Sequence, residues 1–188
     1  DGELKELADR SKYLLSPQDL CGVDHVPRLL EAGVRTFKIE GRLKSPEYVY
    51  VSTLAYRRAI DEAWEAREAA AAAATDVLDA VALENRAAPP PLADDALRQV
   101  FARAQDEEHD GHTPGFFDGP RHQTYVRGLS PSHRGVCAGT VVSAPVANSV
   151  RVRLRAELSA GDGVAFGAAA SEAGGALWAV HAHAGDEV

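Results

Sequence analysis

The sequence predicts an α/β fold joined to a β-rich unit, that is, βα units of a parallel sheet followed by a small β-barrel. Three observations predict this class. Short apolar segments alternate with helical patterns over residues 1–60, prolines crowd together at residues 89–91, and short strand-like runs between glycine turns fill the last part of the chain. We therefore expect a domain over 1–74, a linker over 75–93, and a helix with a small β-barrel over 94–188.

The first βα unit is predicted from the apolar stretch Lys12–Leu15 and the tetrapeptide Ser16-Pro17-Gln18-Asp19. A serine that can cap, a proline suited to the first turn and an aspartate three residues after the serine are typical of a helix start. Apolar residues at helical spacing follow, and Ala32-Gly33 provides a stop. We expect a short helix to begin at Ser16.

The second βα unit combines a strand predicted at Val34–Ile39 with a helix opened by Ser45-Pro46-Glu47. The alanine-rich continuation extends this helix to about Ala74. Beyond the proline run, which favours an extended spacer, Asp94–Ala104 has the pattern of one amphipathic helix with an aspartate cap.

The C-terminal part changes to the period of β-strands. Strands are predicted at residues 139–143, 149–155, 163–166 and 176–183. Turns are predicted at Pro145, at Gly161-Asp162-Gly163 and at Gly174-Gly175. Several short strands in succession favour a small barrel over further βα units.

The composition is that of a globular protein: 188 residues, 45% hydrophobic, with a formal net charge of −8. No apolar stretch approaches the roughly 20 residues that a membrane helix needs, so we expect no membrane partner. The two cysteines, Cys21 and Cys137, are too few for a disulfide-rich secreted domain and favour a cytoplasmic location. Because the chain contains no methionine and begins at Asp1, we expect it to be a fragment.

The acidic charge is concentrated in the middle of the chain, where residues 61–118 hold 4 basic against 14 acidic residues. A locally basic stretch follows over residues 121–155, where Tyr125 offers a ring for stacking. This stretch could track the phosphates of a nucleic acid, and a solvated sheet face is the alternative. The candidate nucleic-acid-binding residues are Arg121, Arg127, Arg134, Arg151 and Arg153.

The densest group of polar residues is Phe37-Lys38-Ile39-Glu40-Gly41-Arg42-Leu43-Lys44. On a strand, alternation puts Lys38 and Glu40 on one face, near the strand end where parallel barrels assemble their active sites. Arg42 and Lys44 follow in the loop, where such cations can bind a carboxylate or a phosphate. We take these four charged residues as the candidate catalytic site, with a structural Lys38–Glu40 ion pair as the alternative.

The remaining chemistry-bearing residues are less informative. Taken alone, Cys21 has the properties of a small buried hydrophobe, since no CxxC partner accompanies it. The histidines, among them His25 and His133, show no zinc spacing and are expected to be solvated. No metalloprotease helix, nucleophile elbow or defensible triad is present in the sequence.

Several motifs together resemble a known family, the collagenase-like peptidase family U32. They run from Tyr13-Leu14-Leu15-Ser16-Pro17-Gln18-Asp19-Leu20-Cys21 through residues 37–45 to Tyr48 and Tyr56-Arg57, and continue in His133-Arg134-Gly135, Gly139-Thr140-Val141 and Gly161-Asp162-Gly163-Val164. The resemblance implies that residues 1–74 are the last βα units of a TIM-like barrel and that the C-terminal part is the family's β-domain.

The resemblance also implies a function. It favours an RNA-modifying protein that hydroxylates a pyrimidine in ribosomal or transfer RNA, with prephenate as a small-molecule donor and with the ribosomal branch preferred. It implies an iron-sulfur cluster on four cysteines in the parent protein, of which Cys21 is one ligand, and no cluster in this chain alone. Two alternatives stay open, a collagenase-like peptidase and a non-catalytic RNA- or protein-binding fragment.

Overall fold

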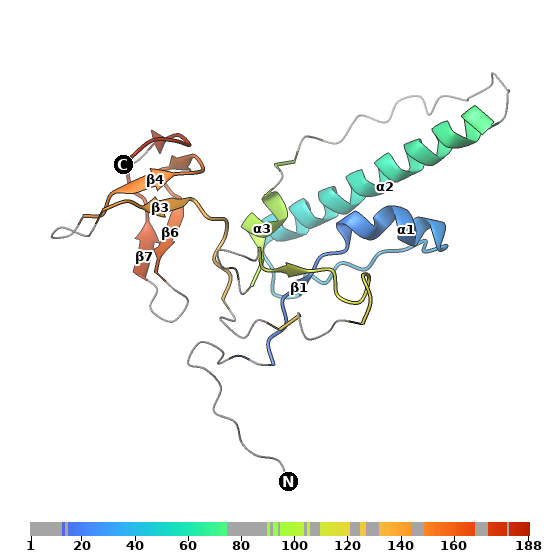
Figure 1. Ribbon diagram of the computed structural model, residues 1–188, viewed down its shortest axis with the longest axis horizontal. Helices are drawn as coiled ribbons and strands as arrows, with labels where there is room; N and C mark the ends of the chain where they lie inside the picture. Colours follow the sequence, from blue (N-terminus) through green and yellow to red (C-terminus); the bar gives the residue numbers. More distant parts are fainter. Residues whose placement is uncertain are drawn as a thin grey trace, which may run out of the picture.

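The computed structural model describes residues 13, 15–74, 90, 92–93, 95–103, 105, 110–120, 125–126, 132–143, 149–167, 173–179 and 181–188. The helices and the first strand lie at one end, and the C-terminal strands lie at the other (Figure 1). Most of the predicted linker over 75–93 falls outside the described residues. None of the described helices is long and apolar enough to cross a membrane.

The N-terminal part places a strand where the sequence predicted a helix start. β1 (Asp19–Leu20) pairs in parallel with β2 (His112–Thr113), and only then do the 3-10 helix η1 (Val23–His25) and α1 (Val26–Glu31) follow. The prediction of a helix from Ser16 is wrong because the backbone N–H groups of this segment bond to distant carbonyls. Gln18 donates to the Tyr125 carbonyl at 2.8 Å and Cys21 donates to the Thr113 carbonyl at 2.9 Å.

The end of α1 matches the predicted stop. Gly33 has φ +91°, and its N–H donates to the Leu30 carbonyl at 3.0 Å. A glycine adopts this left-handed conformation without the penalty that a Cβ would bring. The chain then reverses and returns toward the start of α2 (Figure 1).

The segment 34–39 belongs to none of the described strands, so the strand predicted there is not formed. A strand exists only through hydrogen bonds to a neighbour. The predicted alternation of faces is nevertheless confirmed. Phe37 and Ile39 are half-buried, whereas Lys38 and Glu40 are exposed.

The long helix is confirmed as predicted: α2 spans Pro46–Ala74. The Ser45 hydroxyl accepts from the Tyr48 N–H at 3.3 Å, which supplies the expected cap. The buried side of α2 carries Ser52 and Ala55. It contacts α1, whose Val26 is fully buried.

The next helix is shorter than the predicted 94–104. α3 spans Ala96–Val100 and ends where Phe101 becomes extended, with φ −171°. The backbone N–H groups beyond α3 donate to distant side chains: that of Ala102 to His133, and that of Arg103 to Asp19. These long-range acceptors replace the helical carbonyls.

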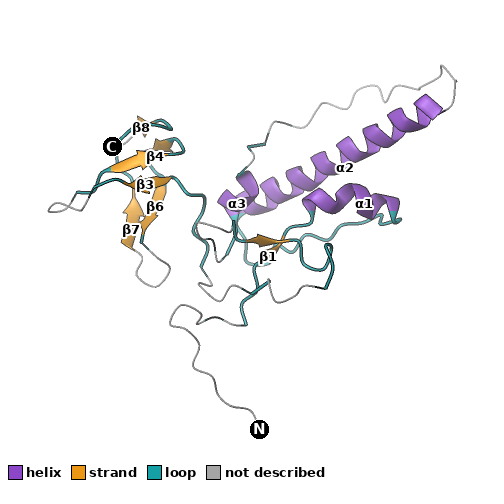
Figure 2. Ribbon diagram, in the orientation of Figure 1, coloured by secondary structure: helices purple, strands orange, loops and turns teal. Residues whose placement is uncertain are grey.

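The C-terminal strands form antiparallel pairs (Figure 2). β3 (Gly139–Val141) pairs with β4 (Val152–Leu154), β5 (Leu158–Ser159) with β8 (His181–Ala182), and β6 (Gly163–Phe166) with β7 (Ala173–Ala176). Four of these six strands fall within the predicted runs, and Leu154 and Ala182 are buried. Since the described strands form two-stranded sheets, both the TIM-like barrel and the small β-barrel stay predictions.

The dipeptide Gly174-Gly175 lies inside β7 and does not form the predicted turn. A Cβ on Gly174 would lie 2.1 Å from the Val164 carbonyl oxygen across the β6–β7 ladder. Glycine is required here for the close approach of two backbones, which the sequence pattern alone does not distinguish from a turn.

Candidate functional site

The candidate site centres on the ring of Phe101, just beyond α3. The Lys44 ammonium lies over this ring, with Nζ 2.7 Å from the ring centroid. The imidazole of His133 stacks on the same ring at 5.5 Å between centroids, with an interplanar angle of 24°. We call Asp19, Lys44, Phe101, Arg103 and His133 the Phe101 junction.

Arg103 connects the junction to β1. Its guanidinium Nη2 donates to Asp19 Oδ1 at 2.7 Å, and its backbone N–H donates to Asp19 Oδ2 at 3.0 Å. Such a charge-assisted fork is stronger than a neutral hydrogen bond. The Asp19 carboxylate raises the pKa of the Arg103 guanidinium above its ordinary value.

His133 is exposed, in line with the expectation that the histidines are solvated, and both of its ring nitrogens also contact the backbone of the segment 99–102. Its Nδ1 lies 3.0 Å from the Ala102 nitrogen and accepts from that N–H in the Nε2–H tautomer, which donates to the Gln99 carbonyl at 3.1 Å. The imidazole thereby provides a hydrogen-bond donor for the Gln99 carbonyl, which lies in the last turn of α3 and has no donor within the helix. The His-Arg-Gly motif therefore anchors the C-terminal part of the chain to α3.

The Lys44 side chain is half-buried in the Phe101 junction. Partial burial lowers the pKa of its ammonium, the nearby Arg103 lowers it further, and Asp19 acts in the opposite direction. A cation over an aromatic face is attracted by the negative face of the ring. Of the four predicted catalytic residues, Lys44 is the one that the described structure places against other side chains of the site.

The other three predicted catalytic residues stay at the surface. Lys38 and Glu40 are 87% and 70% exposed, and the Lys38 Nζ lies 3.8 Å from Glu40 Oε2. Glu40 also accepts from the Arg42 N–H at 2.9 Å, while the Arg42 side chain is exposed. The alternative of a structural Lys38–Glu40 pair thus matches the geometry, as an exposed pair worth little to stability.

The loop between these residues is strained. The Lys44 N–H donates to the Gly41 carbonyl at 3.0 Å, which closes a turn with Arg42 and Leu43 at its centre. Leu43 has φ +63°, a left-handed conformation that costs a residue with a Cβ about 1–2 kcal/mol. Its side chain is 95% exposed.

Cys21 lies directly after β1, close to the junction in sequence and half-buried. Burial raises the pKa of its thiol, and a hydrogen bond from the Val23 N–H acts in the opposite direction. The next residue is fixed by α2, since the Gly22 N–H donates to the Tyr56 hydroxyl at 2.9 Å.

The chain alone does not fit the implied iron-sulfur cluster. Such clusters are held by four thiolates, and the chain has two cysteines. Cys137 is exposed beside β3 and contacts the Gly139 carbonyl at 3.6 Å. Within the described ranges, no three histidine, cysteine or acidic side chains gather as metal ligands. We derive no chemical step through a cluster.

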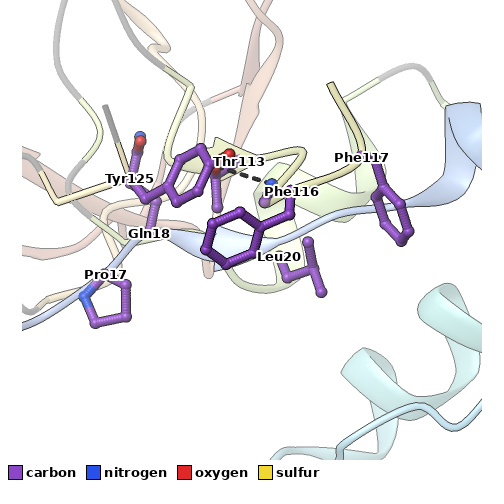
Figure 3. Close-up of a pocket in the computed structure, with 8 residues that line it drawn as sticks. Pro17, Gln18, Leu20, Thr113, Phe116, Phe117 and Tyr125 are labelled. Atoms are coloured by element: carbon purple, nitrogen blue, oxygen red, sulfur yellow. Dashed lines mark hydrogen bonds between the residues drawn. The ribbon is translucent and has the colours of Figure 1, made fainter. Parts of the chain in front are cut away.

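An open groove of about 450 Å³ lies beside β1 and β2. Phe116 and Tyr125 form its aromatic wall, with ring centroids 5.3 Å apart and an interplanar angle of 88°, and Leu20 lies next to them (Figure 3). Gln18, which is 6% exposed, also lines the groove, and its Nε2 has no hydrogen-bond partner in the described structure. Sequence reasoning missed this groove.

His25 departs from the expectation of solvated histidines, since its side chain is 14% exposed. Its Nε2 lies 2.9 Å from Asp118 Oδ1, and its ring stacks on Phe117 at 4.8 Å. These contacts fix the turn at residues 115–118 against η1.

The predicted basic surface is only partly present among the described residues. Arg121 and Arg127 lie outside them. Arg134 donates from Nη2 to the Gly167 carbonyl at 2.6 Å, and Arg153 donates from Nε to Glu187 at 2.9 Å. Arg151 is exposed and has no ion pair with a described carboxylate, so among the described candidates its guanidinium is the open one.

Comparison with known protein families identifies the class of protein to which this fold and site belong. The model of peptidase family U32 matches residues 2–125, so the chain belongs to that family. No solved structure matches significantly.

Individual relatives carry two kinds of name. An uncharacterized protease of Methanocaldococcus jannaschii is 52% identical over 56 residues, and a collagenase of Porphyromonas gingivalis is 45% identical over 56 residues, each covering 30% of this chain. The tRNA hydroxylation protein P of Escherichia coli is 29% identical over 157 residues, or 82% of this chain. The chain spans between 14% and 29% of the length of these three relatives.

Proposed function

We propose that this chain is part of an RNA-modifying enzyme that hydroxylates a pyrimidine in transfer or ribosomal RNA. The supporting observation is that the His133 ring stacks on Phe101, the same ring over which the Lys44 ammonium lies. Through the Phe101 ring, this contact links His133 in the C-terminal part to Lys44 in the 37–45 loop.

The extent of the similarity supports the same proposal. One relative aligns with 82% of the 188 residues. A continuous alignment of that extent contains the His-Arg-Gly motif at residues 133–135, whether the unaligned part lies at the start or at the end of the chain. The relative aligned in this way is named for tRNA hydroxylation. The collagenase is aligned over 30% of the chain.

The roles of the residues follow from charge and position. Lys38, Arg42 and Arg151 carry exposed cations that can bind RNA phosphates. Lys44, held over Phe101, would face the substrate from the junction, and prephenate, a dicarboxylate, would be attracted by the same cations. A cluster would need thiolates from outside this chain in addition to Cys21.

Complementation of cells that lack the full-length gene tests the proposal. We expect nucleoside mass spectrometry to find a hydroxylated pyrimidine restored by the wild-type gene and by the Arg28→Ala control, which alters an exposed cation on α1 away from the junction. Lys44→Met, which keeps the length of the side chain and removes its charge, should restore much less. If all RNA modifications persist without the gene, the proposal is wrong.

A peptidase is the second candidate, favoured by the 45% identity to a collagenase over 56 residues. Cleavage of gelatin by the purified full-length protein, abolished by Glu40→Ala with folding intact, would establish it in place of RNA hydroxylation.

A further inference from the structure

Leu43 occupies a position where glycine is the usual residue. It is the third residue of the turn Gly41–Lys44, and it is the one residue with a Cβ and positive φ among the described residues. Its side chain is 95% exposed, so no packing inside the described structure offsets the strain. Strained backbone of this kind clusters at active sites, ligand clamps and switch regions, so the conformation of Leu43 motivates a search for its function.

Of the two cations in the turn Gly41–Lys44, Arg42 is the one without a charged or aromatic partner among the described residues. The Glu40 carboxylate accepts from the Arg42 N–H, and the Lys44 ammonium lies on the ring of Phe101. The guanidinium of Arg42 makes no ion pair with a described carboxylate and is exposed. The tip of the turn therefore presents an apolar branched side chain next to a free guanidinium.

The local charge indicates what kind of partner fits this tip. Residues 34–45 hold four cations, Arg35, Lys38, Arg42 and Lys44, against the single acid Glu40. The whole chain, by contrast, has a net charge of −8. A polyanion is therefore attracted to this turn and repelled by much of the remaining surface.

We propose that Leu43 is an RNA-contacting wedge, which inserts between two bases of an RNA loop and unstacks them while Arg42 binds the adjacent phosphate. Proteins use leucine and other apolar side chains to separate base steps in DNA. The bases of RNA loops can be splayed out when a protein binds, which makes them accessible to such contacts. The inference rests on the proposed function and names the residues that hold the substrate.

The two residues should affect binding in different ways. Leu43→Ala and Leu43→Gly both remove the apolar contact, so each should weaken binding about tenfold without changing its dependence on salt. Arg42→Ala should reduce the slope of log affinity against log salt by about 0.7, as expected for one phosphate of a single strand. The controls are Leu15→Ala, a leucine that is 97% exposed, and Arg28→Ala.

The experiment uses fluorescence anisotropy of a labelled RNA stem-loop with the 188-residue chain at several salt concentrations. A 2-aminopurine in the loop reports unstacking, and its fluorescence should rise with wild-type protein and with Leu15→Ala but not with the Leu43 variants. If the wild-type chain binds no RNA at low salt, the inference fails, whereas the proposed function stands or falls with the nucleoside mass spectrometry of the full-length gene. If it binds and both Leu43 variants equal Leu15→Ala, the wedge is wrong while RNA binding stands.

A second measurement tests whether Leu43 contacts a second copy of the chain instead of RNA. Analytical ultracentrifugation compares self-association of the wild type with that of Leu43→Gly. Loss of self-association with RNA binding intact would assign the leucine to a contact between two copies of the chain and would overturn the inference.

Discussion

Arg103 holds Asp19 across 84 residues of sequence, with its guanidinium Nη2 2.7 Å from Asp19 Oδ1 and its backbone N–H 3.0 Å from Asp19 Oδ2. The Asp19 side chain is 20% exposed and that of Arg103 is 33% exposed. The contact fixes the segment after α3 against β1. It therefore sets the position of Phe101, which comes shortly before Arg103, and that of Cys21, which comes shortly after Asp19.

Asp19→Asn should lower the free energy of unfolding by about 1–2 kcal/mol, because the amide keeps one acceptor and loses the charge while Arg103 stays partly exposed to screening solvent. Urea unfolding at constant m measures the change. Glu187→Gln is the control. It removes the partner of Arg153 in a pair that is 63% and 41% exposed, and should cost less than about 0.5 kcal/mol. Equal losses for the two variants would contradict the role of Asp19.

Gly174→Ala should destabilise the β6–β7 hairpin by more than about 2 kcal/mol, because the new Cβ would lie 2.1 Å from the Val164 carbonyl oxygen. Gly175→Ala is a matched control, since a Cβ there meets nothing within 4 Å. Amide hydrogen exchange of Val164 and Phe166 measures the local effect. Similar exchange in both variants would show that the backbones do not approach as closely as described.

The contrast between α2 and β1 shows which features could be predicted from the sequence. The start of α2 depends on neighbours within one turn, namely the Ser45 cap, Pro46 and the alanine-rich continuation, so local reasoning predicted it. β1 depends on His112 and Thr113, about 90 residues away, and the local cap-like pattern at Ser16 was misleading.

The candidate site was predicted in part for the same reason. Lys44 belongs to a motif that is dense in charge, so it was found from the sequence. Phe101 and Arg103 are an ordinary aromatic and an ordinary arginine at the end of an amphipathic pattern, and they gain their roles only from Asp19 and His133. A side chain that acts through a distant partner leaves no local signal.

Alkylation of Cys21 should follow a pH profile with a midpoint above 9.0, because burial raises the pKa of its thiol from that value. The experiment uses Cys137→Ala, which removes the exposed second thiol. Since the fold favours the protonated thiol, Cys21 contributes stability below its unfolded pKa, and this contribution is lost as the pH rises through the folded value. A midpoint at or below 9.0 would contradict the burial and indicate a thiolate prepared for ligation.

Leu43→Gly should give a protein more stable than Leu43→Ala by about 1 kcal/mol, although glycine is the more flexible residue in the unfolded chain. Alanine keeps the Cβ and therefore the strain at φ +63°, whereas glycine adopts this conformation freely. Urea unfolding of the two variants measures the difference. Equal stability, or a more stable alanine variant, would show that the turn at Gly41–Lys44 is not strained. A more stable glycine variant that binds RNA more weakly would show that the chain keeps Leu43 for contact with the substrate at the expense of stability.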